Sequence, residues 1–106
     1  MSLKNIFRLT LLLLIYKYKP YGYELMKKIE EISNGLIKVG PGTIYPALFL
    51  LKKRGLITEI VENNRRKRYE LTEKGLKELL DHVSDLEFFY KNILSIIDEL
   101  KQNIPI

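Results

Sequence analysis

The sequence has no cysteine and no tryptophan, and it has a single histidine. Without cysteine, the chain cannot form disulfides, offer a thiol nucleophile or bind zinc through thiolates. The lone His82 has no cluster of ligating side chains around it, so we expect no metal and no cofactor. The lack of cysteine is also typical of a reducing compartment, and we expect a cytoplasmic protein.

Long hydrophobic runs and catalytic motifs are also scarce. Residues 9–16 form the one strongly apolar run, far shorter than the roughly 20 residues of a membrane-spanning helix. We therefore expect a buried core helix and no membrane contact. Gly40-Pro41-Gly42 lacks the lysine pattern of a phosphate-binding loop, and Asp81 and Asp85 lie on an ordinary exposed helix face. The sequence predicts that the protein is not an enzyme.

Positive charge is concentrated in the first two thirds of the chain. Residues 1–72 contain 14 Lys and Arg against 6 Asp and Glu, a net charge of +8, whereas residues 73–106 contain 4 against 7, a net charge of −3. The two parts sum to the overall charge of +5. A basic segment followed by an acidic one indicates a polyanionic partner for the first and a separate role for the second.

Three helices are predicted in the basic part, at residues 4–18, 23–33 and 43–54. The third should begin with Thr43 as its N-cap and Pro46 in its first turn, where a missing N–H costs nothing. At 100° per residue, its apolar residues share one face. The opposite face is unusually aromatic for a solvated surface and calls for a partner. It carries Gly42, Tyr45, Pro46, Phe49 and Lys53.

Two β-like segments follow, at residues 56–62 and 67–71, and they are rich in Ile, Val, Thr and Tyr. A turn is predicted between them at residues 63–66, because asparagine tolerates positive φ. The hairpin carries four consecutive cations at or beside its tip: Arg65, Arg66, Lys67 and Arg68. Three helices followed by a basic hairpin is the order of a winged helix. We therefore predict a mainly α-helical winged helix-turn-helix with a two-stranded β wing.

A long C-terminal helix is predicted from the cap at Thr72 to about residue 102. Its apolar residues are spaced alternately three and four apart, which is a heptad pattern. We call this set the seam, and predict that it dimerises the chain: Leu76, Leu79, Val83, Leu86, Tyr90, Ile93, Ile97 and Leu100, with Ile104 continuing the pattern. The predicted division is a DNA-binding domain over residues 1–72 and a dimerisation helix over residues 73–106.

The second helix of a helix-turn-helix enters the major groove with its N-terminal residues nearest the bases. Thr43 and Tyr45 carry hydroxyl groups suited to base edges or phosphates, while Lys52 and Lys53 suit phosphates. Phe49 fits either groove contact or packing against a neighbouring element. The four wing cations repel one another, and DNA phosphates or a narrow minor groove would relieve that repulsion. A solvated tip that only aids solubility is the alternative, and Lys67 can extend along the core side.

The ordered motifs also resemble those of the PadR family of bacterial and archaeal transcriptional regulators. They are Tyr21-Gly22-Tyr23-Glu24-Leu25, the run Pro41-Gly42-Thr43-Ile44-Tyr45-Pro46-Ala47-Leu48, Gly55-Leu56-Ile57, and Arg66-Lys67-Arg68-Tyr69-Glu70-Leu71-Thr72 with Gly75. The resemblance covers roughly residues 8–76, and the short chain is similar to the small subfamily with one C-terminal helix.

This resemblance implies a winged helix-turn-helix homodimer, usually a repressor, that binds double-stranded DNA. It assigns groove contact to Thr43 and Tyr45 and the wing role to Arg65, Arg66 and Lys67. It also brings Tyr21 or Tyr23 near the DNA backbone. Some small members bind planar aromatic compounds between the two C-terminal helices, which implies a small aromatic effector. Here no tryptophan exists, and Leu86 and Tyr90 in the seam favour interface packing instead.

We therefore predict a sequence-specific regulator that binds a pseudo-palindromic operator as a homodimer. Two alternatives stay open. One is a ligand-responsive repressor with an aromatic-compound pocket at the dimer interface. The other is a winged-helix module that binds proteins and has lost DNA binding.

Overall fold

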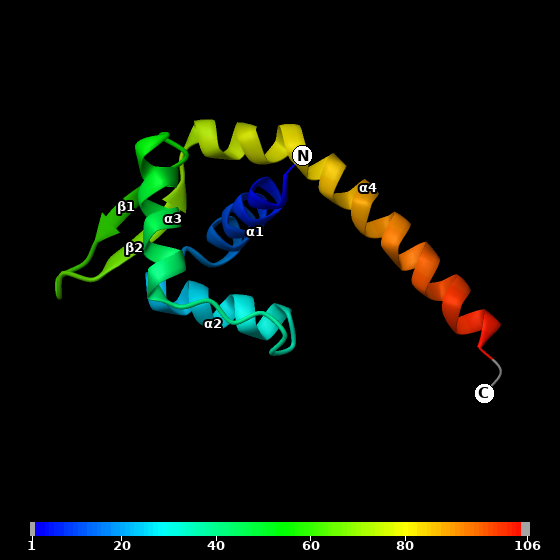
Figure 1. Cartoon of the computed structure of the whole chain (residues 1–106). Helices are drawn as coiled ribbons and strands as arrows, with labels where there is room; N and C mark the ends of the chain where they lie inside the picture. The colour runs from blue at the N-terminus through cyan, green and yellow to red at the C-terminus, as the bar shows by residue number, and fades with distance from the viewer. Residues whose placement is uncertain (1, 105–106) are drawn as a thin grey trace.

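The computed structural model describes residues 2–104. Three helices come first: α1 (Leu3–Tyr18), α2 (Gly22–Ile32) and α3 (Pro41–Lys53). An antiparallel hairpin follows, with β1 (Ile57–Val61) and β2 (Lys67–Leu71), and the long helix α4 (Glu73–Asn103) ends the chain. Figure 1 shows the hairpin beside α3 and α4 crossing over α1. This arrangement confirms the predicted winged helix-turn-helix with a long C-terminal helix.

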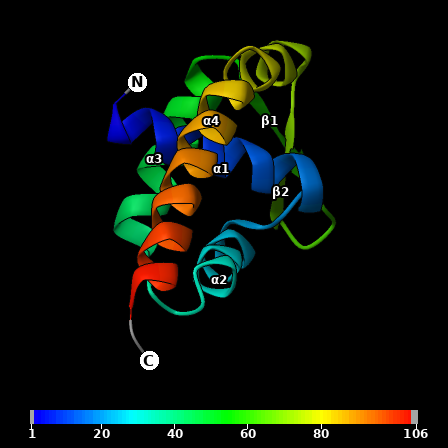
Figure 2. The same ribbon diagram turned by 90° about the vertical axis from the view of Figure 1, so that its right-hand side faces the viewer.

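The helix α1 lies at the centre of the hydrophobic core. Leu9, Leu12 and Ile15 are each no more than 1% exposed, because α1 packs against α2, β2 and α4. Figure 2 shows α1 enclosed between these elements. The run at residues 9–16 is thus mostly buried as a core helix, as predicted. None of the helices within residues 2–104 combines the length and apolarity needed to cross a bilayer.

The helix α3 begins earlier than the sequence predicted. Gly40 is its N-cap and Pro41 occupies the first turn, where a missing N–H costs nothing. Thr43 is therefore a residue of the first turn and not the cap, and Pro46 lies inside the helix. The prediction for these two residues was wrong because two prolines compete for the first turn, and the earlier one occupies it.

The hairpin pairs Ile57 with Leu71 and Val61 with Lys67. In its turn, the Glu62 N–H donates to the Arg66 carbonyl at 2.9 Å and the Arg65 N–H donates to the Glu62 carbonyl at 3.0 Å. The residue with positive φ is Arg65, at 63°, and not an asparagine as predicted. This is the three-residue hairpin loop in which a left-handed residue follows a type I turn.

The helix α4 begins as predicted. The Thr72 hydroxyl accepts a hydrogen bond from the Gly75 N–H at 3.0 Å and donates to the Gly55 carbonyl at 2.6 Å. Its first half packs on α1, and Leu79 belongs to the core. Near its middle the helix changes direction, and its second half extends away from the head of the molecule (Figure 1). Most of that second half has no covering element, and the molecule reaches 58 Å in its longest dimension.

Candidate nucleic-acid interface

The two faces of α3 have opposite environments. Ile44, Leu48 and Leu51 are at most 3% exposed and fix the helix to the core. The opposite face is open to solvent, with Tyr45 46% and Phe49 65% exposed. Exposed residues on α3 also include the other residues predicted to contact DNA: Thr43, Pro46, Lys52 and Lys53. The helix therefore presents its predicted recognition residues outward on a rigid support.

The Tyr45 ring lies against the first turn of α2. A Cβ placed on Gly22 would come 2.7 Å from Cε1 of Tyr45 and 3.0 Å from its hydroxyl oxygen. A Cβ and a ring atom cannot come this close without one of them moving. Because Gly22 has no Cβ, the phenol ring of Tyr45 can occupy this space. The direction of the Tyr45 side chain is therefore set by the backbone of a neighbouring helix.

A groove of about 550 Å³ separates α3 from the hairpin. Glu59 of β1 lies in it and is only 18% exposed at its side chain. It pairs with Lys52 of α3 at 3.2 Å and with Lys67 of β2 at 3.7 Å. One carboxylate thus holds two cations from different elements, which fixes their positions on the outer surface. Burial and the Glu59 charge raise the pKa of Tyr69, whose ring lines the same groove.

The wing (β1, β2 and their turn) is attached to the start of α2 through Tyr21. The Tyr21 hydroxyl donates to Glu62 at 2.5 Å, and this hydrogen bond raises the pKa of the phenol. The Tyr69 N–H donates to the Pro20 carbonyl at 3.0 Å. Arg68 donates to the Lys19 carbonyl at 2.8 Å, and its guanidinium stacks 5.3 Å from the Tyr21 ring centre.

Arg68 therefore differs from the other cations of the wing. It is half-buried and engaged with Lys19, Tyr21 and Glu62, the last at 3.6 Å, so it holds the wing in place. Arg65 and Arg66 are exposed at the tip. The Arg66 guanidinium also lies near the Tyr21 ring, 5.6 Å from its centre. The sequence grouped these cations together, whereas the structure divides them into a structural one and exposed ones.

Tyr23 completes the surface at the start of α2. It is 43% exposed, and its ring stacks on Tyr21 with ring centres 5.8 Å apart. Arg66 of the wing thus contacts the Tyr21 ring, which stacks on Tyr23. Gly22, which lies between these two tyrosines in the sequence, contacts the ring of Tyr45 in α3. The first turn of α2 joins the predicted wing residues to the predicted recognition residues.

Sequence reasoning missed the two carboxylates of this surface, Glu59 and Glu62. Glu59 has a detectable signal, because the period of two in a strand places it on the same side as the buried Ile57. No local pattern marks Glu62, because its hydrogen-bond partner Tyr21 lies 41 residues away in the sequence.

The structure divides the predicted seam of α4 into two parts. Leu79 is 4% exposed and packs in the hydrophobic core of the chain, so little of its surface is left for the dimer contact predicted from the sequence. Val83 and Leu86 are half-buried, and Leu86 packs against that core. Leu76, at the start of the helix, is 40% exposed. The remaining seam residues are between 38% and 61% exposed: Tyr90, Ile93, Ile97 and Leu100.

Three helices with a hairpin beside the third define a winged helix-turn-helix, a fold of transcriptional regulators. Residues 11–81 match the model of the Transcriptional regulator PadR-like family. That match spans more than half of the chain, and the protein belongs to this family.

Individual relatives agree with this assignment. The chain is 35% identical over 86 residues to "Transcriptional regulator YqjI" of Escherichia coli, a match that covers 81% of the chain. The match covers only 42% of that relative, so the chain spans less than half the length of the curated relatives it matches.

Solved structures share the fold. A PadR-like transcriptional regulator from Bacillus cereus superimposes with a TM-score of 0.75 at 27% identity, covering 90% of this chain and 94% of the other. A putative transcriptional regulator from Thermoplasma acidophilum gives a TM-score of 0.66 at 30% identity, covering 97% of each chain.

Proposed function

We propose that the chain is a sequence-specific DNA-binding repressor that acts as a homodimer on a pseudo-palindromic operator. The observation that carries this proposal is the exposed face of α3, where Tyr45 is held against Gly22 beside a cationic wing. Membership in a family of transcriptional regulators supports it. Such a protein acts where the chromosome is, in the cytoplasm.

The conformation of Arg65 supports a role for the wing tip. A left-handed conformation costs roughly 1 kcal/mol for a residue with a Cβ, and glycine or asparagine would avoid most of it. A long cation at this position gains nothing from the fold, since its side chain is exposed. DNA phosphates would stabilise a charge presented in this way.

In the proposed complex, α3 enters the major groove with Thr43 and Tyr45 near the base edges. Lys52, held by Glu59, and Lys53 lie at the far end of α3, next to the phosphates. The wing places Arg65 and Arg66 on the adjacent backbone or minor groove. The two α3 helices of a dimer should lie about 34 Å apart, or a multiple of it, to match successive turns of DNA.

The experiment that tests this proposal compares Arg65→Ala with Tyr45→Ala. We expect Arg65→Ala to weaken binding to every sequence and to reduce the slope of log affinity against log salt by about 1. Tyr45→Ala should instead cost about 1–3 kcal/mol on the operator alone and relax sequence preference. Both are measured by titrating labelled genomic fragments, including the region upstream of the protein's own gene, at two salt concentrations.

A distant cation provides the control. Lys101→Ala removes a charge from the end of α4, and its affinity for the operator should stay unchanged. If the unmodified protein binds no DNA even at low salt, the proposal fails, and a protein-binding role for the winged helix is favoured.

Gly22→Ala should reproduce part of the Tyr45→Ala defect without changing any predicted DNA-contacting residue. The added methyl group requires the Tyr45 ring to move, because their separation would otherwise be 2.7 Å. The end of a tyrosine side chain can move, so we expect the melting temperature to change little while operator selectivity falls. The double variant Gly22→Ala, Tyr45→Ala should be no less selective than Tyr45→Ala alone. Additive losses would show that Gly22 acts independently of Tyr45.

A further inference from the structure

A carboxylate lies within the cationic surface that is proposed to bind DNA. The groove between α3 and the wing is lined by three lysines, Lys52, Lys53 and Lys67. Among the described residues that line this groove, Glu59 is the one with a negative charge. DNA phosphates are anions, so a carboxylate at this place opposes the attraction that the lysines provide. Glu59 therefore weakens the binding of any DNA, whatever its sequence.

Packing of the hairpin does not require a charge at this position. Glu59 pairs in register with Tyr69, and Ile57 lies two residues before it, on the same side of β1. Both of these neighbours are buried, so an apolar side chain would suit this side of the strand. A carboxylate that is largely removed from water is costly unless it is paired. Stability of the fold alone therefore does not explain why a glutamate occupies the position.

Both lysine partners of Glu59 lie beside the same carboxylate oxygen. The Nζ atoms of Lys52 and Lys67 are 3.2 Å and 3.7 Å from Oε2. Lys52 belongs to α3 and Lys67 to β2, so this carboxylate joins the recognition helix to the wing that lies beside it (Figure 1). We call these three residues the Glu59 cluster, and their charges sum to +1. An unpaired lysine is a flexible chain that can follow any phosphate backbone, whereas these two are held in place.

We propose that Glu59 is a specificity-determining residue, which keeps Lys52 and Lys67 from binding the phosphates of DNA that does not fit α3. This inference rests on the proposed function. Binding to unrelated DNA comes almost entirely from phosphate contacts, so it is weakened by the full effect of the carboxylate. At the operator, base contacts from α3 bring the phosphates to the positions at which the two lysines are held. Charges arranged in this way suppress wrong partners more than the right one.

The test replaces Glu59 with glutamine, which has nearly the same shape and no charge. Fluorescence anisotropy measures the affinity of the full chain for its operator and for a scrambled duplex of the same length and base composition. For Glu59→Gln, affinity for the scrambled duplex should rise about tenfold at low salt. The slope of log affinity against log salt should steepen by about 0.9, for one more neutralised phosphate. Operator affinity should rise by about threefold at most, so the preference for the operator falls.

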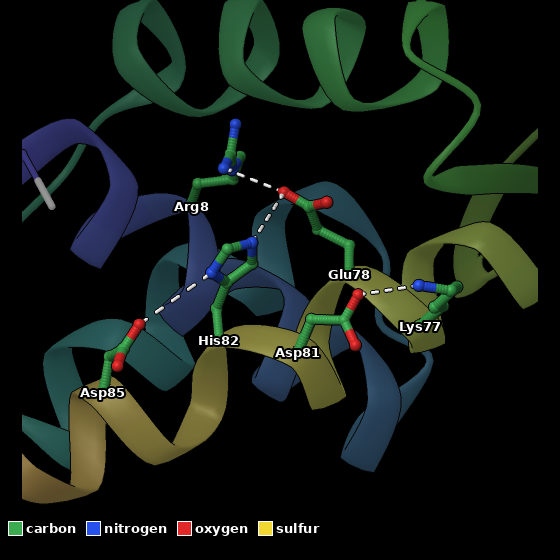
Figure 3. Close-up of polar contacts among 6 residues, drawn as sticks. All are labelled: Arg8, Lys77, Glu78, Asp81, His82 and Asp85. Carbon is green, nitrogen blue, oxygen red and sulfur yellow. Dashed lines mark hydrogen bonds and ion pairs between the residues drawn. The ribbon is translucent and has the colours of Figure 1, made fainter.

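Asp81→Asn is the matched control, with the same change of charge at another carboxylate. Like Glu59, Asp81 pairs with a lysine, Lys77 of the same helix, at 2.9 Å. This pair lies on α4, outside the proposed DNA surface. Lys77 is followed by Glu78, whose carboxylate pairs with Arg8 of α1 at 2.9 Å (Figure 3). Because charges beyond a Debye length are screened, Asp81→Asn should change affinity for the scrambled duplex by less than about twofold.

The double variant Glu59→Gln, Lys67→Gln returns the charge of the Glu59 cluster to +1. Its affinity for the scrambled duplex should return to within about twofold of that of the unmodified protein. An equal rise for both duplexes in Glu59→Gln, or a change no larger than in Asp81→Asn, would overturn the inference. So would a loss of operator affinity alone, which would indicate a base contact by Glu59. Absence of DNA binding by the unmodified protein would refute the proposed function as well, whereas these outcomes refute the inference alone.

Discussion

Replacing Gly75 with alanine should lower the free energy of unfolding by about 3 kcal/mol or more. Gly75 is buried in the first turn of α4. A Cβ at this position would lie 1.9 Å from the Leu56 carbonyl oxygen and 2.9 Å from its carbon. The obstacle is backbone, so the clash is relieved only by moving α4 away from the hairpin. Chemical denaturation at fixed protein concentration measures the loss.

Gly42→Ala is the matched control. Gly42 also lies in the first turn of a helix, α3, but a Cβ there would meet nothing within 4 Å. Alanine should therefore be neutral or stabilise the protein by up to about 1 kcal/mol. A Gly75→Ala protein as stable as Gly42→Ala would contradict the close approach of α4 to Leu56.

Ile97→Glu should convert the proposed homodimer into monomers. Ile97 is 38% exposed in the half of α4 that extends beyond the head, so its replacement leaves the subunit core intact. A symmetric dimer would bring two new carboxylates into its apolar contact, and we expect the dissociation constant to rise about a hundredfold or more. Sedimentation measures the change. Operator affinity should fall with it, because the two half-sites would no longer be bound together.

Ser95→Glu separates the effect of position from that of charge. Ser95 lies on the same part of α4, two residues before Ile97 and therefore on the opposite side of the helix. The Ser95→Glu protein should remain dimeric, and circular dichroism should show the same helix content as in the unmodified protein. If Ile97→Glu also stayed dimeric, the exposed seam would not be the contact between subunits. Leu86→Glu is a weaker test, because Leu86 packs against the core and its loss also affects folding.

The features that the sequence predicted well depend on periodicity and capping. The two strands of the hairpin, the cap at Thr72 and the extent of α4 all follow from local patterns, and the structure confirms them. The start of α3 could not be predicted from local patterns, because Pro41 and Pro46 are both acceptable in a first turn and only tertiary packing selects one. The left-handed residue was likewise misassigned, since propensity favours asparagine over Arg65.

The features that escaped prediction join distant parts of the chain. Arg8 and Glu78 are 70 residues apart, and neither lies in a motif that signals the other. The same holds for Gly22 and Tyr45, whose contact sets the direction of a predicted DNA-contacting side chain. Composition identified which residues could bind DNA, but it could not show that Arg68 is committed to the Lys19 carbonyl.

The continuity of α4 constrains how this protein can change in length. Its first half is fixed to the head and its second half carries the proposed contact between subunits, and both belong to one uninterrupted helix. One inserted residue near the middle would rotate the exposed half by about 100° and advance it by about 1.5 Å. The partner's head would then leave its half-site. Insertions within α4 should therefore impair operator binding, and even a seven-residue insertion, which restores the face of the helix, would displace the exposed half by about 10.5 Å.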